Sequence, residues 1–203
     1  HTCGMTTLGE TYCWGSNDSG QLGDGTITNR NEPTLVSGGY TWSSVDGGGW
    51  HTCGVTSTDN GYCWGRNKYG GLGDGTVTTR RQPVAISGAH AWASITGGSE
   101  NTCGLTSAGE AYCWGRDRYA LVNQHGVDIA FPERMTLGPQ DLEMIDLSLG
   151  NHSACAVYSD GTTACWGQHI FGQTGTGWAV GQENLTGFAE LTLSDAPRLL
   201  GSP

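Results

Sequence analysis

The chain has 203 residues with a formal net charge of −10, and 35 of the residues are glycine. The negative charge disfavours nucleic-acid binding, which needs a basic face, and no apolar run reaches the roughly 18 residues that cross a bilayer, so membrane insertion is not expected either. The glycine content is far above the usual ~7% and, without a G-x-y period, indicates many repeated tight turns.

The first predicted element is a β-hairpin between Cys3 and Cys13. It holds a short apolar strand, a turn and a second strand rich in Tyr, Cys and Trp, which are typical strand residues. If the two cysteines lie opposite each other, residues 7–9 form a three-residue loop that needs a left-handed residue in its last position. Gly9 suits that position, and the equivalent residues of the later copies are Asp59, Gly109 and Gly161.

All eight cysteines belong to four copies of this unit: Cys3, Cys13, Cys53, Cys63, Cys103, Cys113, Cys155 and Cys165. The connectivity that treats every copy alike is one disulfide within each hairpin, and an antiparallel pair can bring opposite Cβ atoms to bonding distance. Two alternatives remain, a zinc site that uses the His-x-Cys spacing and reactive thiols, although the chain has no Cys-x-x-Cys. Disulfides indicate an oxidising compartment: extracellular, cell-surface or periplasmic.

Each copy continues with a Gly-rich loop, a Pro-led strand (33–36 and 83–86) and a Trp-x-x-Val/Ile strand (42–45 and 92–95). Four short strands in a period of about 50 residues are typical of a β-propeller blade. We therefore predict an all-β fold, a propeller of four-stranded blades with the tryptophans packed between them. The chain is interpreted as one repeat domain, 1–203, with repeats at 1–50, 51–100, 101–151 and 152–203.

The Asp-Gly-Thr turns in the loops after Trp-Gly offer too few carboxylates for calcium, so we expect each Asp to cap its own backbone. A polar residue recurs before the first cysteine, as His1, His51 and Asn101, and is predicted to bond backbone within its own blade. No nucleophile or carboxylate is matched to it, so no catalytic residue, metal or cofactor is expected. Glycosylation sequons stand at Asn17, Asn151 and Asn184.

The loops after Trp-Gly should emerge together on one rim, because the strands are committed to packing. Two of these loops carry cations and tyrosines at equivalent places, side chains that are common in binding hot spots. The predicted binding residues are Arg66, Lys68, Tyr69, Arg116, Arg118 and Tyr119. An ordinary soluble surface is the alternative interpretation of the same residues.

The sequence HTCGVT…GYCWGRNKYGGLGDGT…PV at residues 51–84 closely resembles the repeat of the regulator of chromosome condensation family. Residues 1–50 match as well, 101–115 match before they diverge, and the fourth copy matches around 154–167. The resemblance implies a propeller that usually has seven blades. Four repeats fall short of that number, so we expect an excerpt of a longer chain, part of a larger ring or of an oligomeric assembly. The paired cysteines resemble those of secreted, mostly bacterial members.

These observations favour an extracellular, non-catalytic protein-binding or scaffold module that binds a protein partner or itself. A structural subunit of a surface layer or filament and a propeller hydrolase or lyase are the alternatives. Guanine-nucleotide exchange, the best-known activity of the family, is disfavoured because it suits a reduced, nuclear protein.

Overall fold

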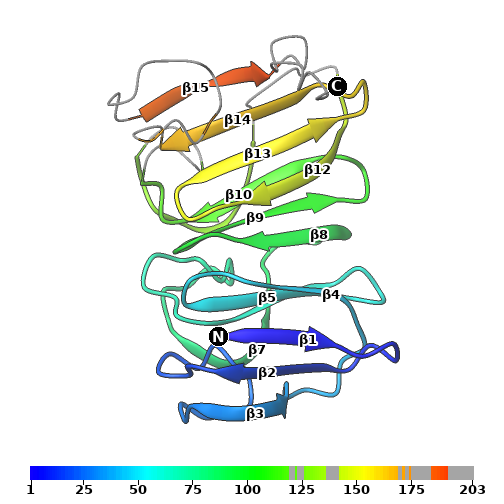
Figure 1. The fold of residues 1–203 in the computed structure, drawn as a ribbon, viewed down its shortest axis with the longest axis vertical. Coiled ribbons are helices and arrows are strands. Elements are labelled where there is room, and N and C mark those ends of the chain that lie inside the picture. The colour runs from blue at the N-terminus through cyan, green and yellow to red at the C-terminus, as the bar shows by residue number, and fades with distance from the viewer. Residues whose placement is uncertain are drawn as a thin grey trace, which may run out of the picture.

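The computed structural model describes residues 1–118, 122, 126–135, 142–168, 171 and 174, and the backbone of 184–191. This part of the chain is all-β and forms four small antiparallel sheets, as predicted (Figure 1). It contains no helix of the length and apolarity that would cross a membrane.

The first sheet has three strands and the other three sheets have four strands each, paired in chain order. The first consists of β1 (Thr2–Met5), β2 (Thr11–Gly15) and β3 (Arg30–Leu35). The second consists of β4 (Trp42–Gly47), β5 (His51–Thr56), β6 (Gly61–Gly65) and β7 (Arg80–Ala85). The third consists of β8 (Trp92–Gly97), β9 (Asn101–Thr106), β10 (Ala111–Gly115) and β11 (Ile129–Arg134). The fourth consists of β12 (Met144–Leu149), β13 (Ser153–Tyr158), β14 (Thr163–Gln168) and β15 (Asn184–Leu191).

The sheets are offset from the sequence repeats. The Trp-x-x-Val strand that ends one repeat pairs with the first hairpin strand of the next, so that Trp42 lies opposite Thr56 and Gly47 opposite Thr52. One sheet therefore joins the end of one repeat to the beginning of the following repeat, and the repeats are tied together by main-chain hydrogen bonds.

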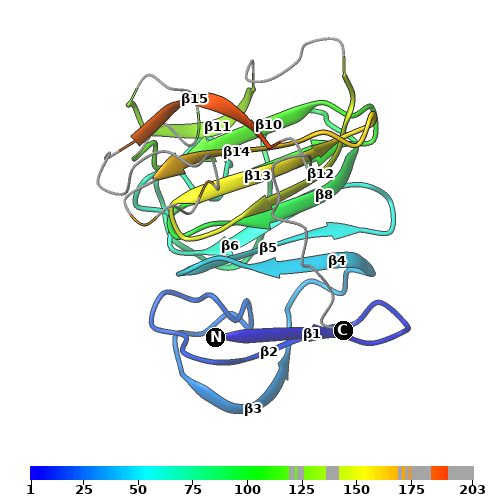
Figure 2. The ribbon, with the colours of Figure 1, turned by 45° about the horizontal axis from the view of Figure 1, so that its top comes forward.

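Neighbouring sheets pack through their first and second strands: β8 contacts β4 and β5, and β12 contacts β8 and β9. Figures 1 and 2 show the sheets following one another in chain order, as blades do around a propeller axis. The predicted inter-blade tryptophans are buried there, with Trp64 and Trp114 at 0% exposure. Trp64 and Trp42 of the second sheet cluster with Leu22 from the loop of the first sheet, so large apolar side chains hold the two sheets together.

The cysteine hairpins have the predicted geometry. Cys3 lies opposite Cys13, and all four hairpins are bridged, with Cα atoms 4.0 to 4.1 Å apart. The last loop residue is left-handed in each hairpin, including the non-glycine residue Asp59 at φ 61°. The zinc and reactive-thiol interpretations are wrong, because the chain has no free cysteine.

A buried polar relay joins neighbouring blades. His51 Nε2 lies 2.8 Å from the hydroxyl of Thr102 in the next sheet, and that hydroxyl donates to the carbonyl of Gly71 at 2.7 Å. The Trp114 indole nitrogen donates to the same carbonyl at 2.9 Å. We expected this histidine to form a hydrogen bond with the backbone of its own blade. That expectation is wrong, because its partner is a side chain of the next blade. An equivalent relay involves His1, Thr52, Gln21 and Trp64.

Candidate protein-binding rim

The loops after Trp-Gly lie at one end of the sheets, where β6 and β10 finish. The backbone N–H of Arg66 donates to the carbonyl of Trp50 at 2.9 Å, and that of Arg116 donates to the carbonyl of Glu100 at 3.0 Å. Each arginine is thereby set beside the residue that precedes its own blade's second strand. These two bonds give neighbouring blades the same arrangement at this rim.

One carboxylate joins the two predicted cationic loops. Glu100 forms an ion pair with Arg66 at 2.9 Å through one oxygen, and its other oxygen accepts a hydrogen bond from Arg116. The hydrogen bond from Arg116 to this carboxylate raises the pKa of the guanidinium. Two cations that lie 50 residues apart in the sequence are therefore held side by side by one acidic residue.

The cationic side chains of both loops lie over aromatic rings. The Arg116 guanidinium lies 4.4 Å from the ring centre of Tyr69, and the Lys68 ammonium lies 5.2 Å from the same ring. Arg66 lies 5.8 Å from the ring of Trp50, which is 43% exposed. Cations at these distances from aromatic faces are attracted by the ring quadrupole, so the cluster is held by side chains of two blades.

The structure thus brings five of the six predicted binding residues to one rim, and we call these five with Trp50, Glu100 and His152 the cationic rim: Trp50, Arg66, Lys68, Tyr69, Glu100, Arg116, Arg118 and His152. Tyr119 lies outside the described residues.

Three rim residues were missed by sequence reasoning. Trp50, Glu100 and His152 each stand three places before the first cysteine of their hairpin. This shared position was the available signal, but the three side chains differ chemically and so form no motif. Burial lowers the pKa of His152, and the charges of Arg118 and Arg116 lower it further.

Two hollows lie in the rim. The hollow beside Trp50 and Tyr69 has a volume of about 10 Å³, enough for a single water at most. The hollow between the third and fourth blades has about 180 Å³ and is lined by Ser99, Glu100, Asn101, Arg116, Arg118 and His152. The first part of the rim is therefore a closed surface and the second an open pocket.

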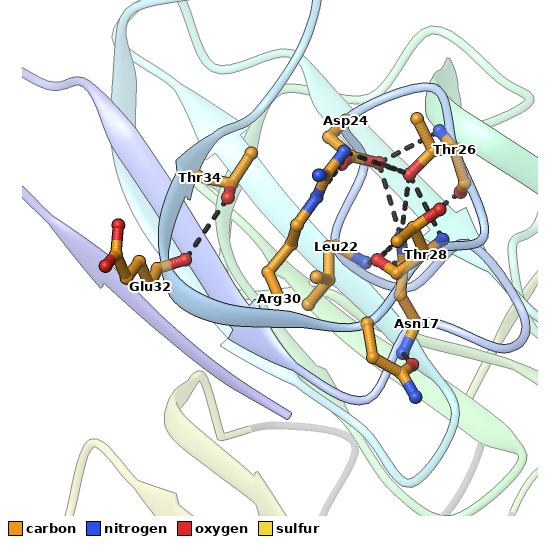
Figure 3. A network of polar contacts seen from close by, with 9 residues as sticks. Asn17, Leu22, Asp24, Thr26, Thr28, Arg30, Glu32 and Thr34 are labelled. Atoms are coloured by element: carbon orange, nitrogen blue, oxygen red, sulfur yellow. Dashed lines mark hydrogen bonds and ion pairs between the residues drawn. The ribbon is translucent and has the colours of Figure 1, made fainter.

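The Asp-Gly-Thr turns have a structural role (Figure 3). The Asp24 carboxylate accepts hydrogen bonds from the backbone N–H of Thr26 at 2.9 Å and from Arg30 at 2.9 Å. Burial opposes its ionisation, but the hydrogen bonds from Thr26 and Arg30 lower the pKa of Asp24 overall. The predicted cap is thus confirmed and is reinforced by an arginine. Among the described residues, no group of three or more His, Cys, Asp or Glu side chains lies close enough together to hold a metal ion.

Asn17, the first predicted sequon, organises the same turn. It is completely buried, and its amide donates to Asp24 and to the carbonyls of Thr26 and Thr28 while it accepts the N–H of Leu22 (Figure 3). A glycan on this nitrogen is incompatible with the fold. The sequon residue Asn151 is exposed, and the side chain of Asn184 lies outside the described residues.

A second groove, of about 400 Å³, lies at the opposite end of the sheets between the β5–β6 hairpin and the β7–β8 connection. His90 packs against Tyr112 there, with ring centres 4.2 Å apart. Among the described residues that line it, Asp59 has the one charged side chain. The concentration of charge therefore distinguishes the cationic rim from this groove.

Comparison with known proteins supports the interpretation of the repeats. The Regulator of chromosome condensation (RCC1) repeat matches residues 9–55 and 61–105, and a second form of the same repeat matches residues 92–120. The human and mouse E3 ubiquitin-protein ligases HERC2 are 50% identical over 38 residues, which is 19% of this chain and 1% of those proteins.

Solved structures show the same fold. Human WBSCR16 superposes with a TM-score of 0.84 at 22% identity over 94% of this chain and 50% of its own. Prp20p from Saccharomyces cerevisiae gives 0.74 at 21% identity over 86% and 45%. The ectodomain of the Physcomitrella patens receptor kinase CR4 gives 0.50 at 24% identity over 81% and 35%. This chain thus spans half or less of each of these structures. The repeat matches and the shared fold together show that the chain belongs to the RCC1 repeat family.

Proposed function

We propose that this chain is part of a secreted, disulfide-containing RCC1-repeat protein, of the type most common in bacteria, and that it is a non-catalytic module that binds an acidic segment of a protein partner through the cationic rim. The observation that carries the proposal is the shared Glu100, which holds Arg66 and Arg116 together beside exposed aromatic surface.

The charges of the rim favour an acidic partner. The rim carries four cationic side chains and the carboxylate of Glu100, on a chain whose net charge is −10. The cations are Arg66, Lys68, Arg116 and Arg118. The negative charge of Asp128 also interacts with Arg116, and the cations of the rim still outnumber these two carboxylates. A local cationic surface on an acidic protein attracts negatively charged partners and orients them during encounter.

The aromatic residues favour binding over simple solubility. Tyr69 lies under both Lys68 and Arg116, so the long cationic side chains already have supported positions before a partner arrives. Preordered side chains lose less conformational entropy on binding, and Tyr, Trp and Arg are the usual hot-spot residues.

The four disulfides favour a location outside the reducing cytoplasm, because such bridges persist in oxidising compartments. The CR4 ectodomain shows that this fold occurs in an ectodomain.

Fluorescence anisotropy with a labelled peptide of ten glutamates, and with its glutamine counterpart, tests the proposal. We expect the glutamate peptide to bind at least about tenfold more tightly, and to lose affinity with added salt because the contacts are ionic. Tyr69→Ala should weaken binding by about 2 kcal/mol, or roughly 30-fold, with an unchanged melting temperature.

Two variants serve as controls. Tyr69→Phe keeps the ring and should bind like the wild type, and so should Val77→Ala, which removes an exposed side chain from the same loop. Wild-type affinity in Tyr69→Ala would remove the binding site from the rim. Concentration-dependent assembly in sedimentation experiments, without peptide binding, would favour the structural-subunit alternative instead.

A further inference from the structure

The polar relay between blades changes at the third junction. In the third blade the Thr102 hydroxyl donates its one hydrogen to Gly71, so it must accept the Nε2–H of His51 in the second blade. The next blade has Ala154 in the place of that threonine, because Ala154 lies opposite Trp166 just as Thr102 lies opposite Trp114. The acceptor hydroxyl is therefore missing at this junction.

Asn101 is the donor that this change leaves without an acceptor. It occupies the same place as His51 at the start of the second strand and is only 3% exposed. Its amide nitrogen is buried and finds no hydrogen-bond partner among the residues that the structure describes. An unpaired buried donor costs about 1–3 kcal/mol, so a ligand that supplies an acceptor gains this energy. The side-chain oxygen packs against Gly98, where one added carbon would lie 2.3 Å from it.

Asn101 is one of the residues that line the 180 Å³ hollow of the rim. Arg116 and Arg118 line the same hollow, so cationic donors and the asparagine face one space. Glu100 is the acidic side chain among the described residues of the lining, and it is already bonded to Arg66 and Arg116. The hollow is large enough for a side chain rather than for one water.

We infer that this hollow, which we call the Asn101 pocket, binds one carboxylate side chain of the partner's acidic segment. The inference rests on the proposed function and names the group that the rim recognises. The Asn101 amide would donate to one carboxylate oxygen, and the neighbouring guanidinium groups would supply charge-assisted hydrogen bonds.

A carboxylate suits the pocket better than a phosphate group. Glu100 stands in the lining, and Asp128 is close enough to affect Arg116. A doubly charged phosphate would meet two carboxylates of the protein, whereas a singly charged carboxylate is balanced by one arginine.

The test follows the side-chain amide of Asn101 by ¹⁵N NMR during titration with N-acetyl-glutamate N-methylamide. We expect a saturable shift of this resonance. The glutamate analogue should bind at least about tenfold more tightly than the glutamine analogue or inorganic phosphate. Ala154→Ser restores a hydroxyl at the position that Thr102 has in the preceding blade and should abolish the shift. Arg118→Gln changes an exposed residue, keeps the fold and should weaken binding at least about fivefold.

The outcomes separate the two proposals. If the Asn101 resonance does not shift with the glutamate analogue, but binding of the glutamate peptide still requires Tyr69, the pocket is refuted and the proposed function is supported. Tighter binding of phosphate also overturns the carboxylate assignment. A shift that survives in Ala154→Ser, with native melting of that variant, shows that the missing hydroxyl does not create the site. Saturable binding of the analogue without any Tyr69-dependent peptide binding supports the pocket and removes the proposed function.

Discussion

The imidazole of His51 and the hydroxyl of Thr102 form a 2.8 Å hydrogen bond between neighbouring blades, and both residues are at most 1% exposed. Burial lowers the pKa of His51 from 6.5 to about 4, so the folded protein keeps this side chain neutral. A neutral imidazole carries one N–H, and the relay requires that hydrogen on Nε2 because the hydroxyl donates to Gly71.

This buried histidine predicts a loss of stability in mild acid. Because the pKa of His51 in the folded protein is below its unfolded value, the unfolded chain binds the proton more readily. The stabilisation is complete above pH 6.5 and is lost as the pH falls toward 4, by about 3 kcal/mol in total. Urea denaturation at pH 7 and pH 5 measures it. His51→Asn should show a smaller pH dependence, and equal slopes for the two proteins would contradict the prediction.

Removal of the relay hydroxyl should destabilise the junction between blades. Thr102→Val keeps the shape but leaves the His51 donor buried and unpaired, which costs about 1–3 kcal/mol. Thr2→Val is the matched control, since Thr2 has the same place in the first sheet and is exposed. The control should change stability by less than about 0.5 kcal/mol. Chemical denaturation gives both values, and similar losses in the two variants would count against the relay.

Each disulfide closes a short loop, so its removal should cost about 3 kcal/mol through the entropy of the unfolded chain. The double variant Cys53→Ala, Cys63→Ala should lose more than the corresponding variant at Cys3 and Cys13. The reason is that both sulfurs of the second bridge are completely buried and leave a cavity, whereas Cys3 is partly exposed. Thermal melting compares the variants, and peptide mapping after alkylation should find no free thiol. Links between different hairpins would refute the assignment.

The Asp-Gly-Thr turn of the second repeat depends on Asn67. Its amide donates to Asp74 at 3.1 Å and accepts the backbone N–H of Leu72 at 2.9 Å, and it is 1% exposed. Asn67→Ala leaves the buried Leu72 N–H unsatisfied, so we expect a loss of about 2–3 kcal/mol in unfolding free energy. The neighbouring exposed variant Lys68→Ala should melt like the wild type. If Asn67→Ala also does so, the turn is held by Asp74 and its arginine alone.

Local features of the fold were predictable from the sequence. The spacing of Cys53 and Cys63 defines a hairpin register, and the left-handed position in the loop accepts Asp59 or glycine. These features depend on residues within ten positions of one another, so backbone geometry and side-chain chemistry are enough to infer them. The Asp-Gly-Thr cap is local in the same way. The period of the repeats then indicated several similar sheets. Apolar side chains on both faces of a sheet indicated that the sheets stack, because each apolar face must be covered.

Contacts between blades were decided by the tertiary structure. Glu100 reaches Arg66 across 34 positions, and the Asn101 amide nitrogen has no hydrogen-bond partner among the described residues, in the repeat that is followed by Ala154, 53 positions later, in place of a threonine. Neither residue type signals such a role by itself, since a surface glutamate and a buried alanine are common. The sequence alone therefore determined which strands, turns and bridges form and that the rim would be cationic. Packing of the sheets decided which cations share a carboxylate and which buried donor remains unpaired, because both depend on distances between blades that no local pattern encodes.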